Sequence, residues 1–142
     1  MSNKASNPIP QGKYVPANRV NNLIFTSGMT PRDNGILLRE GPIMISDDIS
    51  VIKPSVELAT KNALTAAKNV LNEDEKIEKI VNLTVYLNCE DGFTKHASIG
   101  DIASNFLYEE LGEKGSCART TVGVHTLPSN APVEIQLIVS VE

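Results

Sequence analysis

The chain has 142 residues, 41% of them hydrophobic, which is enough for one domain with a buried core. Its 17 acidic residues outnumber 13 basic ones, the net charge is -4, and the basic residues are scattered along the chain. This balance argues against a protein that binds the phosphate backbone of nucleic acids. No segment approaches the length of about 18 apolar residues that a membrane span requires.

The two cysteines, Cys89 and Cys117, lie outside any C-x-x-C pattern and have no histidine cluster beside them. Neither a zinc site nor a disulfide framework is therefore expected. The N-terminus lacks the apolar region of a signal peptide, and the chain has no H-E-x-x-H, P-loop or G-x-G-x-x-G motif. We expect a soluble, cytoplasmic protein that needs no metal and no cofactor.

The first part of the chain is typical of a polar arm followed by a strand. Residues 1–13 carry two prolines and a glycine, and we expect a flexible arm ahead of a single domain over residues 14–142. The segment NLIFTSG, residues 22–28, combines β-prone side chains with a Ser-Gly turn. It predicts a strand that leaves into a loop.

The middle of the chain alternates between helical and extended patterns. Apolar residues at helical spacing predict a helix over residues 54–71, with Pro54 in its first turn. The segment KIVNLTVYLNC, residues 79–89, has the period of a strand. The apolar face of that strand is expected to consist of Val81, Leu83, Val85 and Leu87. Helical spacing returns over residues 91–111, and Gly112 is suited to end this second helix.

Two further strands, residues 118–124 and 133–141, complete the domain, and alternate residues of the second one form a continuous apolar face. This order predicts an α+β fold with one sheet and two helices on one of its faces, because neither helix could bury its apolar stripe alone. The other face of the last strand mixes polar and apolar side chains, so it does not fit a buried core, and it carries too few charges for a surface exposed to solvent. It carries Glu134, Gln136, Ile138 and Ser140. We expect this face to associate with other copies of the chain.

Two segments, YVPANRVNNLIFTSGMTP (residues 14–31) and ARTTVGVHTLPSNAPVEIQLIVSVE (residues 118–142), resemble the signature blocks of the Rid family. Members of this family, also called YjgF, are reactive-intermediate deaminases once catalogued as L-PSP endoribonucleases. The resemblance covers nearly the whole chain from Tyr14 and keeps the order of elements. It implies a chorismate-mutase-like α+β fold with a mixed sheet, a homotrimer, and three clefts between subunits that bind a small imine, enamine or keto acid.

The resemblance also implies the site residues. The family arginine falls on Arg119, which is expected to bind a substrate carboxylate, and the family glutamate falls on Glu134, which is expected to orient water or carry a proton. We expect Arg119 and Glu134 to approach each other across partner strands. The family's ligand-binding turn falls on Ser27 and Gly28, and its cleft-closing aromatic residue on Tyr14.

Two positions depart from the family pattern. Many active members have cysteine where this chain has Thr121, which is still expected to line the cleft, and the family asparagine appears only as Gly100 or Asp101. Two functions therefore stay open. One is the hydrolysis of imine or enamine acids, such as 2-aminoacrylate and 2-iminobutanoate, to keto acids and ammonia, and the other is non-catalytic binding of small carboxylates. Endoribonuclease activity is disfavoured by the acidic balance.

Each candidate residue also has a structural alternative. Arg119 could form an ion pair at a strand edge or between subunits, and Glu134 could be its partner. Ser27 and Gly28 could simply form a turn, and Tyr14 could simply pack.

Three further polar residues carry weaker expectations. Cys117 has the strand parity of the family arginine, so it either reaches the cleft or packs as a small hydrophobic residue. His96 is expected to face solvent, and His125 is expected to have no catalytic role, because nothing in the sequence pairs it with a nucleophile.

Overall fold

The computed structural model describes residues 5–142, so the first four residues of the predicted arm lie outside the described part of the chain. Its strands are β1 (Ala17–Val20), β2 (Leu23–Thr26), β3 (Arg32–Asp33), β4 (Ile36–Leu37), β5 (Ile77–Asn88), β6 (Ala118–Val124) and β7 (Val133–Val141). The helices are α1 (Ile49–Lys68) and α2 (His96–Leu111), with short 3-10 turns at Gly112–Gly115 and Pro128–Asn130. Neither helix in this part of the chain is long and apolar enough to cross a membrane.

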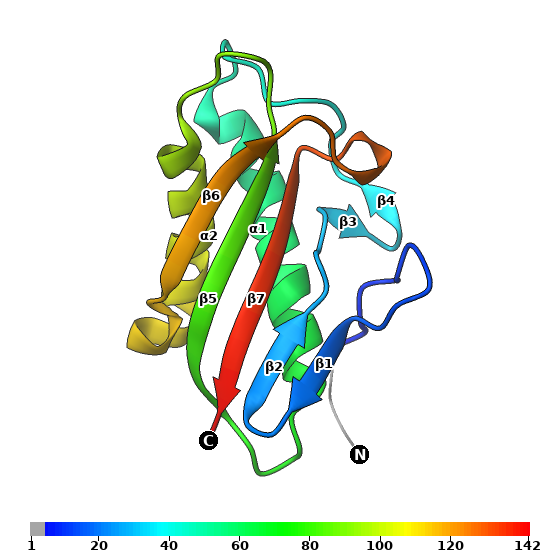
Figure 1. Cartoon of the computed structure of the whole chain (residues 1–142), viewed down its shortest axis with the longest axis vertical. Helices are drawn as coiled ribbons and strands as arrows, with labels where there is room; N and C mark the ends of the chain where they lie inside the picture. Colours follow the sequence, from blue (N-terminus) through cyan, green and yellow to red (C-terminus); the bar gives the residue numbers. More distant parts are fainter. Residues whose placement is uncertain (1–4) are drawn as a thin grey trace.

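Five strands form one sheet in the order β1-β2-β7-β5-β6, and both helices cover the same face of it (Figure 1). β7 pairs antiparallel with β2 on one side and with β5 on the other, whereas β5 and β6 run parallel. A parallel pair needs a crossover connection, and α2 provides it. The predicted α+β fold with a mixed sheet and two helices on one face is confirmed.

The core lies between the sheet and the helices. The predicted apolar face of β7 is confirmed, because all of its members are buried: Val133, Ile135, Leu137, Val139 and Val141. The expectation for β5 needs one correction, since Val81 is 38% exposed while Ile80 is fully buried. The pairing of β5 with β7 shifts register between Ile80 and Asn82, and such a bulge moves the side chains before it to the other face.

Both helices begin at residues other than those predicted. α1 begins at Ile49, because the side chain of Asp48 accepts a hydrogen bond from the Ser50 amide at 2.9 Å and caps the helix. Pro54 therefore lies inside the helix and not in its first turn. α2 begins at His96, because the residues before it form a turn in which Gly92 has a φ of 86°.

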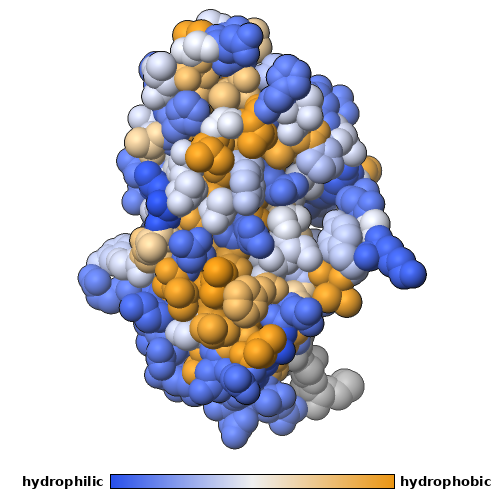
Figure 2. Space-filling model, in the orientation of Figure 1, coloured by the Kyte–Doolittle hydropathy of each residue, from blue (hydrophilic) through white to orange (hydrophobic). Residues whose placement is uncertain are grey.

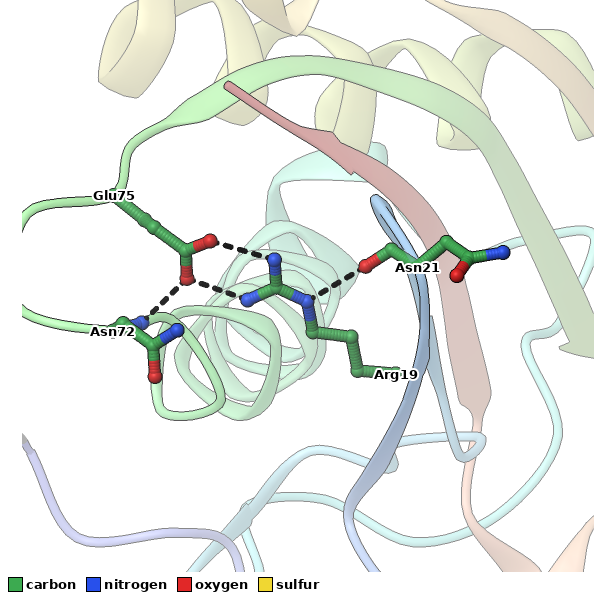
Figure 3. A network of polar contacts seen from close by, with 4 residues as sticks. All are labelled: Arg19, Asn21, Asn72 and Glu75. Atoms are coloured by element: carbon green, nitrogen blue, oxygen red, sulfur yellow. Dashed lines mark hydrogen bonds and ion pairs between the residues drawn. The ribbon is translucent and has the colours of Figure 1, made fainter.

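A doubly hydrogen-bonded ion pair fastens the β1–β2 hairpin to the segment between α1 and β5 (Figure 3). Arg19 donates to the two carboxylate oxygens of Glu75 at 2.5 and 2.6 Å, and the Asn72 amide donates to the same carboxylate at 2.7 Å. Mainly through the bonds from Arg19, the pKa of Glu75 is lowered to about 2. The ionised carboxylate therefore stabilises this end of the sheet.

The sheet face that the helices leave open carries an apolar patch, seen over the strands in Figure 2. Four apolar side chains of this face are each 38–39% exposed, namely Leu23, Phe25, Val81 and Val122. An exposed apolar patch of this kind is typical of an interaction surface. It lies on the face for which the sequence predicts self-association.

Candidate functional site

Arg119 lies on the helix-covered side of the edge strand β6, where its guanidinium group is bound to α2. Nη1 donates to Asp101 Oδ1 and to Ser104 Oγ, both at 2.9 Å, and Nη2 donates to the carbonyl of Ala97 at 3.5 Å. These three residues share one face of α2, because they are spaced by four and three positions. Arg119 therefore forms an ion pair within the chain, and its partner is Asp101.

The contact between Arg119 and α2 depends on Gly100. A Cβ atom at this position would lie 2.5 Å from Thr121 Oγ1 and 2.9 Å from Arg119 Cζ. The buried hydroxyl of Thr121 makes no hydrogen bond with any described residue. The absence of a side chain at Gly100 thus gives Arg119 and Thr121 room to pack against the helix.

Glu134 lies on the open face of β7, beside Gly28. A Cβ atom on Gly28 would be 2.5 Å from Glu134 Oε2, so the turn can approach this carboxylate only because residue 28 is glycine. Among the described residues none forms a hydrogen bond or an ion pair with the Glu134 side chain. The carboxyl group is half-buried, and this burial raises its pKa.

Ser27 and Tyr14 lie on the same side of the molecule as Gly28. Ser27 Oγ donates to the carbonyl of Val15 at 2.6 Å, and the hydroxyl of Tyr14 accepts a hydrogen bond from the Gln11 amide at 3.0 Å. Tyr14 and Gly28 also line a cavity of about 230 Å³ that extends towards α1. Neither Arg119 nor Glu134 lines this cavity.

The expected approach of Arg119 to Glu134 across partner strands is wrong within one chain. β5 lies between β6 and β7, and it pairs Leu83 with Arg119 and Tyr86 with Glu134. Leu83 is fully buried under the helices, and side chains alternate along a strand, so Arg119 and Glu134 lie on opposite faces of the sheet. The expectation failed because it treated consecutive strands as neighbours, whereas the crossover through α2 carries β6 to the far side of β5.

The site residues thus fall into two groups within the chain. The arginine group consists of Arg119, Thr121, Gly100, Asp101 and Ser104. The glutamate group consists of Glu134, Gly28, Ser27 and Tyr14. The sequence reasoning missed the role of Ser104 and of the carboxylate at Asp101, and their spacing of three residues on one helix face was the signal that could have identified them.

The remaining polar candidates show no sign of nucleophilic activation. Burial raises the pKa of the Cys117 thiol, although the neighbouring Arg119 acts in the opposite direction. His96 is partly buried and packs edge-on against Phe93, with ring centroids 5.4 Å apart, so the expectation that it faces solvent is only partly met. Within residues 5–142, no group of three His, Cys, Asp or Glu side chains is placed to hold a metal ion.

Comparisons with known proteins agree with this architecture. The profile of the family "Endoribonuclease L-PSP" matches residues 4–141. A 2-iminobutanoate/2-iminopropanoate deaminase of Dermatophagoides farinae is 30% identical over 139 residues, which cover 95% of this chain and 91% of the relative. A RutC family protein of Pyrococcus abyssi is 27% identical over 132 residues, which cover 92% of this chain and 88% of the relative. The solved structure of Atu1372 from Agrobacterium tumefaciens, a protein of unknown function, superposes with a TM-score of 0.86 at 32% identity, covering 97% of this chain and 87% of that one. The chain therefore belongs to the endoribonuclease L-PSP family, the family of Rid and YjgF proteins that its two signature segments resemble.

Proposed function

We propose that the protein hydrolyses small imine or enamine acids, such as 2-aminoacrylate and 2-iminobutanoate, to keto acids and ammonia. The observation that carries this proposal is the carboxyl group of Glu134, which is half-buried, has a raised pKa and has no partner among the described residues. A carboxyl group whose pKa is raised in this way is suited to accept and return a proton. The deaminase of Dermatophagoides farinae, 30% identical to this chain, supports the same reaction class.

The proposed site lies between subunits of a homotrimer. Arg119 and Glu134 occupy opposite faces of the sheet in one chain, so a pocket that contains both needs residues from two copies. The apolar patch on the open face supports association of this kind. In this arrangement the arginine group of one subunit faces the glutamate group of its neighbour.

Each group has a distinct part in the proposed reaction. Arg119 binds the substrate carboxylate and places the C=N carbon near Glu134 of the neighbouring subunit. Glu134 takes a proton from water as the water oxygen bonds to that carbon, and it then gives a proton to the nitrogen. The carbon–nitrogen bond then breaks, and ammonia leaves with the bonding electrons. The hydroxyl group on the carbon gives its proton to the Glu134 carboxylate, so the carbon becomes the carbonyl of the keto acid. An enamine acid first takes a proton from solvent on its β-carbon and so becomes the iminium form.

Non-catalytic binding of small carboxylates is the second candidate function. It is favoured by one observation, the engagement of the Arg119 guanidinium by Asp101, Ser104 and the Ala97 carbonyl. It also fits the departures from the family pattern, which are Thr121 at the position of the family cysteine and Gly100 or Asp101 at that of the family asparagine.

The experiment that separates the two candidates is a coupled assay. 2-Iminobutanoate is generated in place by a dehydratase, and the release of 2-oxobutanoate is followed above the spontaneous rate. Hydrolysis should be accelerated by the wild type but not by Glu134→Gln or Arg119→Ala, while Glu109→Gln, an exposed charge change on α2, should behave like the wild type. A wild type that binds 2-oxobutanoate in calorimetry without accelerating hydrolysis would establish the binder instead.

A further inference from the structure

We infer that Asp101 selects ligands in which the carboxylate is accompanied by a positively charged nitrogen on the adjoining carbon, as in an iminium acid or an α-amino acid. The inference rests on the proposed function in one respect, namely that Arg119 binds the carboxylate. It adds a specificity-determining residue and the charge pattern of the ligand.

The first observation is that the structure places two opposite charges side by side. Asp101 Oδ1 lies 2.9 Å from Arg119 Nη1, and the Asp101 side chain is 65% exposed. Its second oxygen, Oδ2, has no hydrogen-bond partner among the described residues, so it can accept a bond from a ligand. An α-nitrogen acid carries the complementary pair of charges, with its carboxylate and its cationic nitrogen attached to the same carbon.

The second observation is that Arg119 can be reached from only part of its surface. Its side chain is 22% exposed, and Nε lies 3.0 Å from the position that a Cβ atom on Gly100 would occupy, so this edge of the guanidinium packs against α2. Nη1 is already shared by Asp101 and Ser104. A ligand carboxylate therefore has to approach the Nη end of the group, next to the carboxylate of Asp101.

The charge of Asp101 acts on any ligand that Arg119 binds. Two carboxylates that share one guanidinium repel each other, whereas a cationic nitrogen beside the ligand carboxylate attracts Asp101. A plain keto acid or hydroxy acid meets this repulsion without the compensating attraction. Asp101 thus acts on specificity mainly by disfavouring anions that lack the adjacent cation.

The test compares two ligands with the same carbon skeleton and the same carboxylate. L-2-Aminobutanoate carries an ammonium group where L-2-hydroxybutanoate carries a hydroxyl group, and calorimetry gives the dissociation constant of each. The wild type should bind the amino acid about two- to fivefold more tightly, as expected for one partly exposed charge pair. In Asp101→Asn, which keeps the shape but loses the charge, this ratio should fall to about one or below.

Two controls isolate the carboxylate of Asp101. Glu109→Gln removes one exposed negative charge from the same helix and should keep the wild-type ratio. Glu134 is unchanged in all of these proteins, so its charge contributes equally to every ratio. The unfolding midpoint of Asp101→Asn shows whether the variant is folded.

The possible outcomes separate this inference from the proposed function. A wild type without preference, or an Asp101→Asn variant that keeps the wild-type ratio, overturns the inference. If both ligands bind more weakly to the variant at an unchanged ratio, Asp101 only positions Arg119, and the inference is again wrong. If 2-oxobutanoate binds in a manner that depends on Arg119 while the amino acid does not bind, the inference fails and the carboxylate site stands. If no carboxylate binds at all, the proposed function and this inference both fail.

Discussion

Replacing Gly100 with alanine tests directly whether Arg119 and Thr121 pack against α2. The added methyl group would lie 2.5 Å from Thr121 Oγ1, 2.9 Å from Arg119 Cζ and 3.0 Å from Arg119 Nε. Each of these distances is shorter than an ordinary contact between non-bonded atoms. Thr121 is β-branched and rotates with difficulty, and the guanidinium of Arg119 is held by Asp101 and Ser104.

Two effects of opposite sign determine the free energy of unfolding of Gly100→Ala. Alanine is favoured over glycine inside a helix by about 0.8–1 kcal/mol. Overpacking typically costs about 1–3 kcal/mol, and it applies here because Gly100 is buried. Taking the middle of this range, we expect a net destabilisation of about 1 kcal/mol, which corresponds to a fall of about 3–4 °C in the midpoint of thermal unfolding.

The assay is thermal or urea unfolding of Gly100→Ala beside Ser98→Ala. Ser98 is an exposed residue of the same helix, so its replacement should be neutral or slightly stabilising. Gly100→Ala should also weaken the binding of carboxylates, because Arg119 is displaced. If Gly100→Ala were more stable than the wild type by the increment expected from helix propensity alone, the packing of Arg119 against α2 would be refuted.

Four further predictions concern charge and assembly. Glu134→Gln should lower turnover more than ligand affinity. Because the folded-state pKa of Glu134 is raised, the free energy of unfolding of the wild type should fall as the pH rises through that pKa, and urea unfolding of the variant should not show this fall. Glu75→Gln should be less stable than the wild type at pH 7. The difference in the free energy of unfolding should close as the pH falls from about 4.3, the pKa of glutamate in the unfolded chain, towards about 2, the pKa of Glu75 in the folded chain. A difference that does not change with pH would contradict the role of the ion pair with Arg19. Light scattering should give a trimer for the wild type and smaller species for Phe25→Glu. The control Ile36→Glu changes a residue that is 73% exposed and lies outside the apolar patch, so it should remain trimeric. A wild-type monomer at micromolar concentration would exclude the proposed cleft. 2-Oxobutanoate should raise the unfolding midpoint of the wild type. Arg119→Lys should weaken the binding of 2-oxobutanoate by roughly tenfold, since an ammonium group cannot form two parallel hydrogen bonds with a carboxylate. An equal rise of the midpoint in both proteins would refute the binding of the carboxylate by Arg119.

The sequence predicted the regular elements better than their arrangement. The bounds of β6 and β7 agree with the prediction, because alternating apolar residues and flanking turn residues are local signals. The predicted start of α1 is wrong because proline is common in the first turn of a helix, whereas Pro54 lies inside this one and Asp48 provides the cap. The bulge in β5 could not be predicted, since it depends on pairing with β7, a strand about 50 residues further along the chain.

The sequence predicted which residues belong to the candidate site but not how they are arranged in space. The family resemblance pointed to Arg119 and Glu134, yet their separation follows from the parallel pairing of β5 with β6, which periodicity does not reveal. The ion pair between Arg119 and Asp101 depends in turn on the close approach of α2 at Gly100. Strand order and helix approach are tertiary properties, so one sequence read by local patterns leaves them open.

The position of β7 has a consequence for how the chain reaches its folded state. This strand comes after every other element in chain order, yet it lies in the sheet between β2 and β5. Until it has been synthesised, the β1–β2 hairpin and the unit formed by β5, α2 and β6 have no strand to join them, and the edges of β2 and β5 that pair with β7 stay open. Pairings as distant as Ile24 with Val139 close large loops, which makes folding slow and leaves the nascent chain exposed to aggregation. Completion of the sheet therefore waits for β7, and until then the unpaired edges of β2 and β5 can pair with other strands.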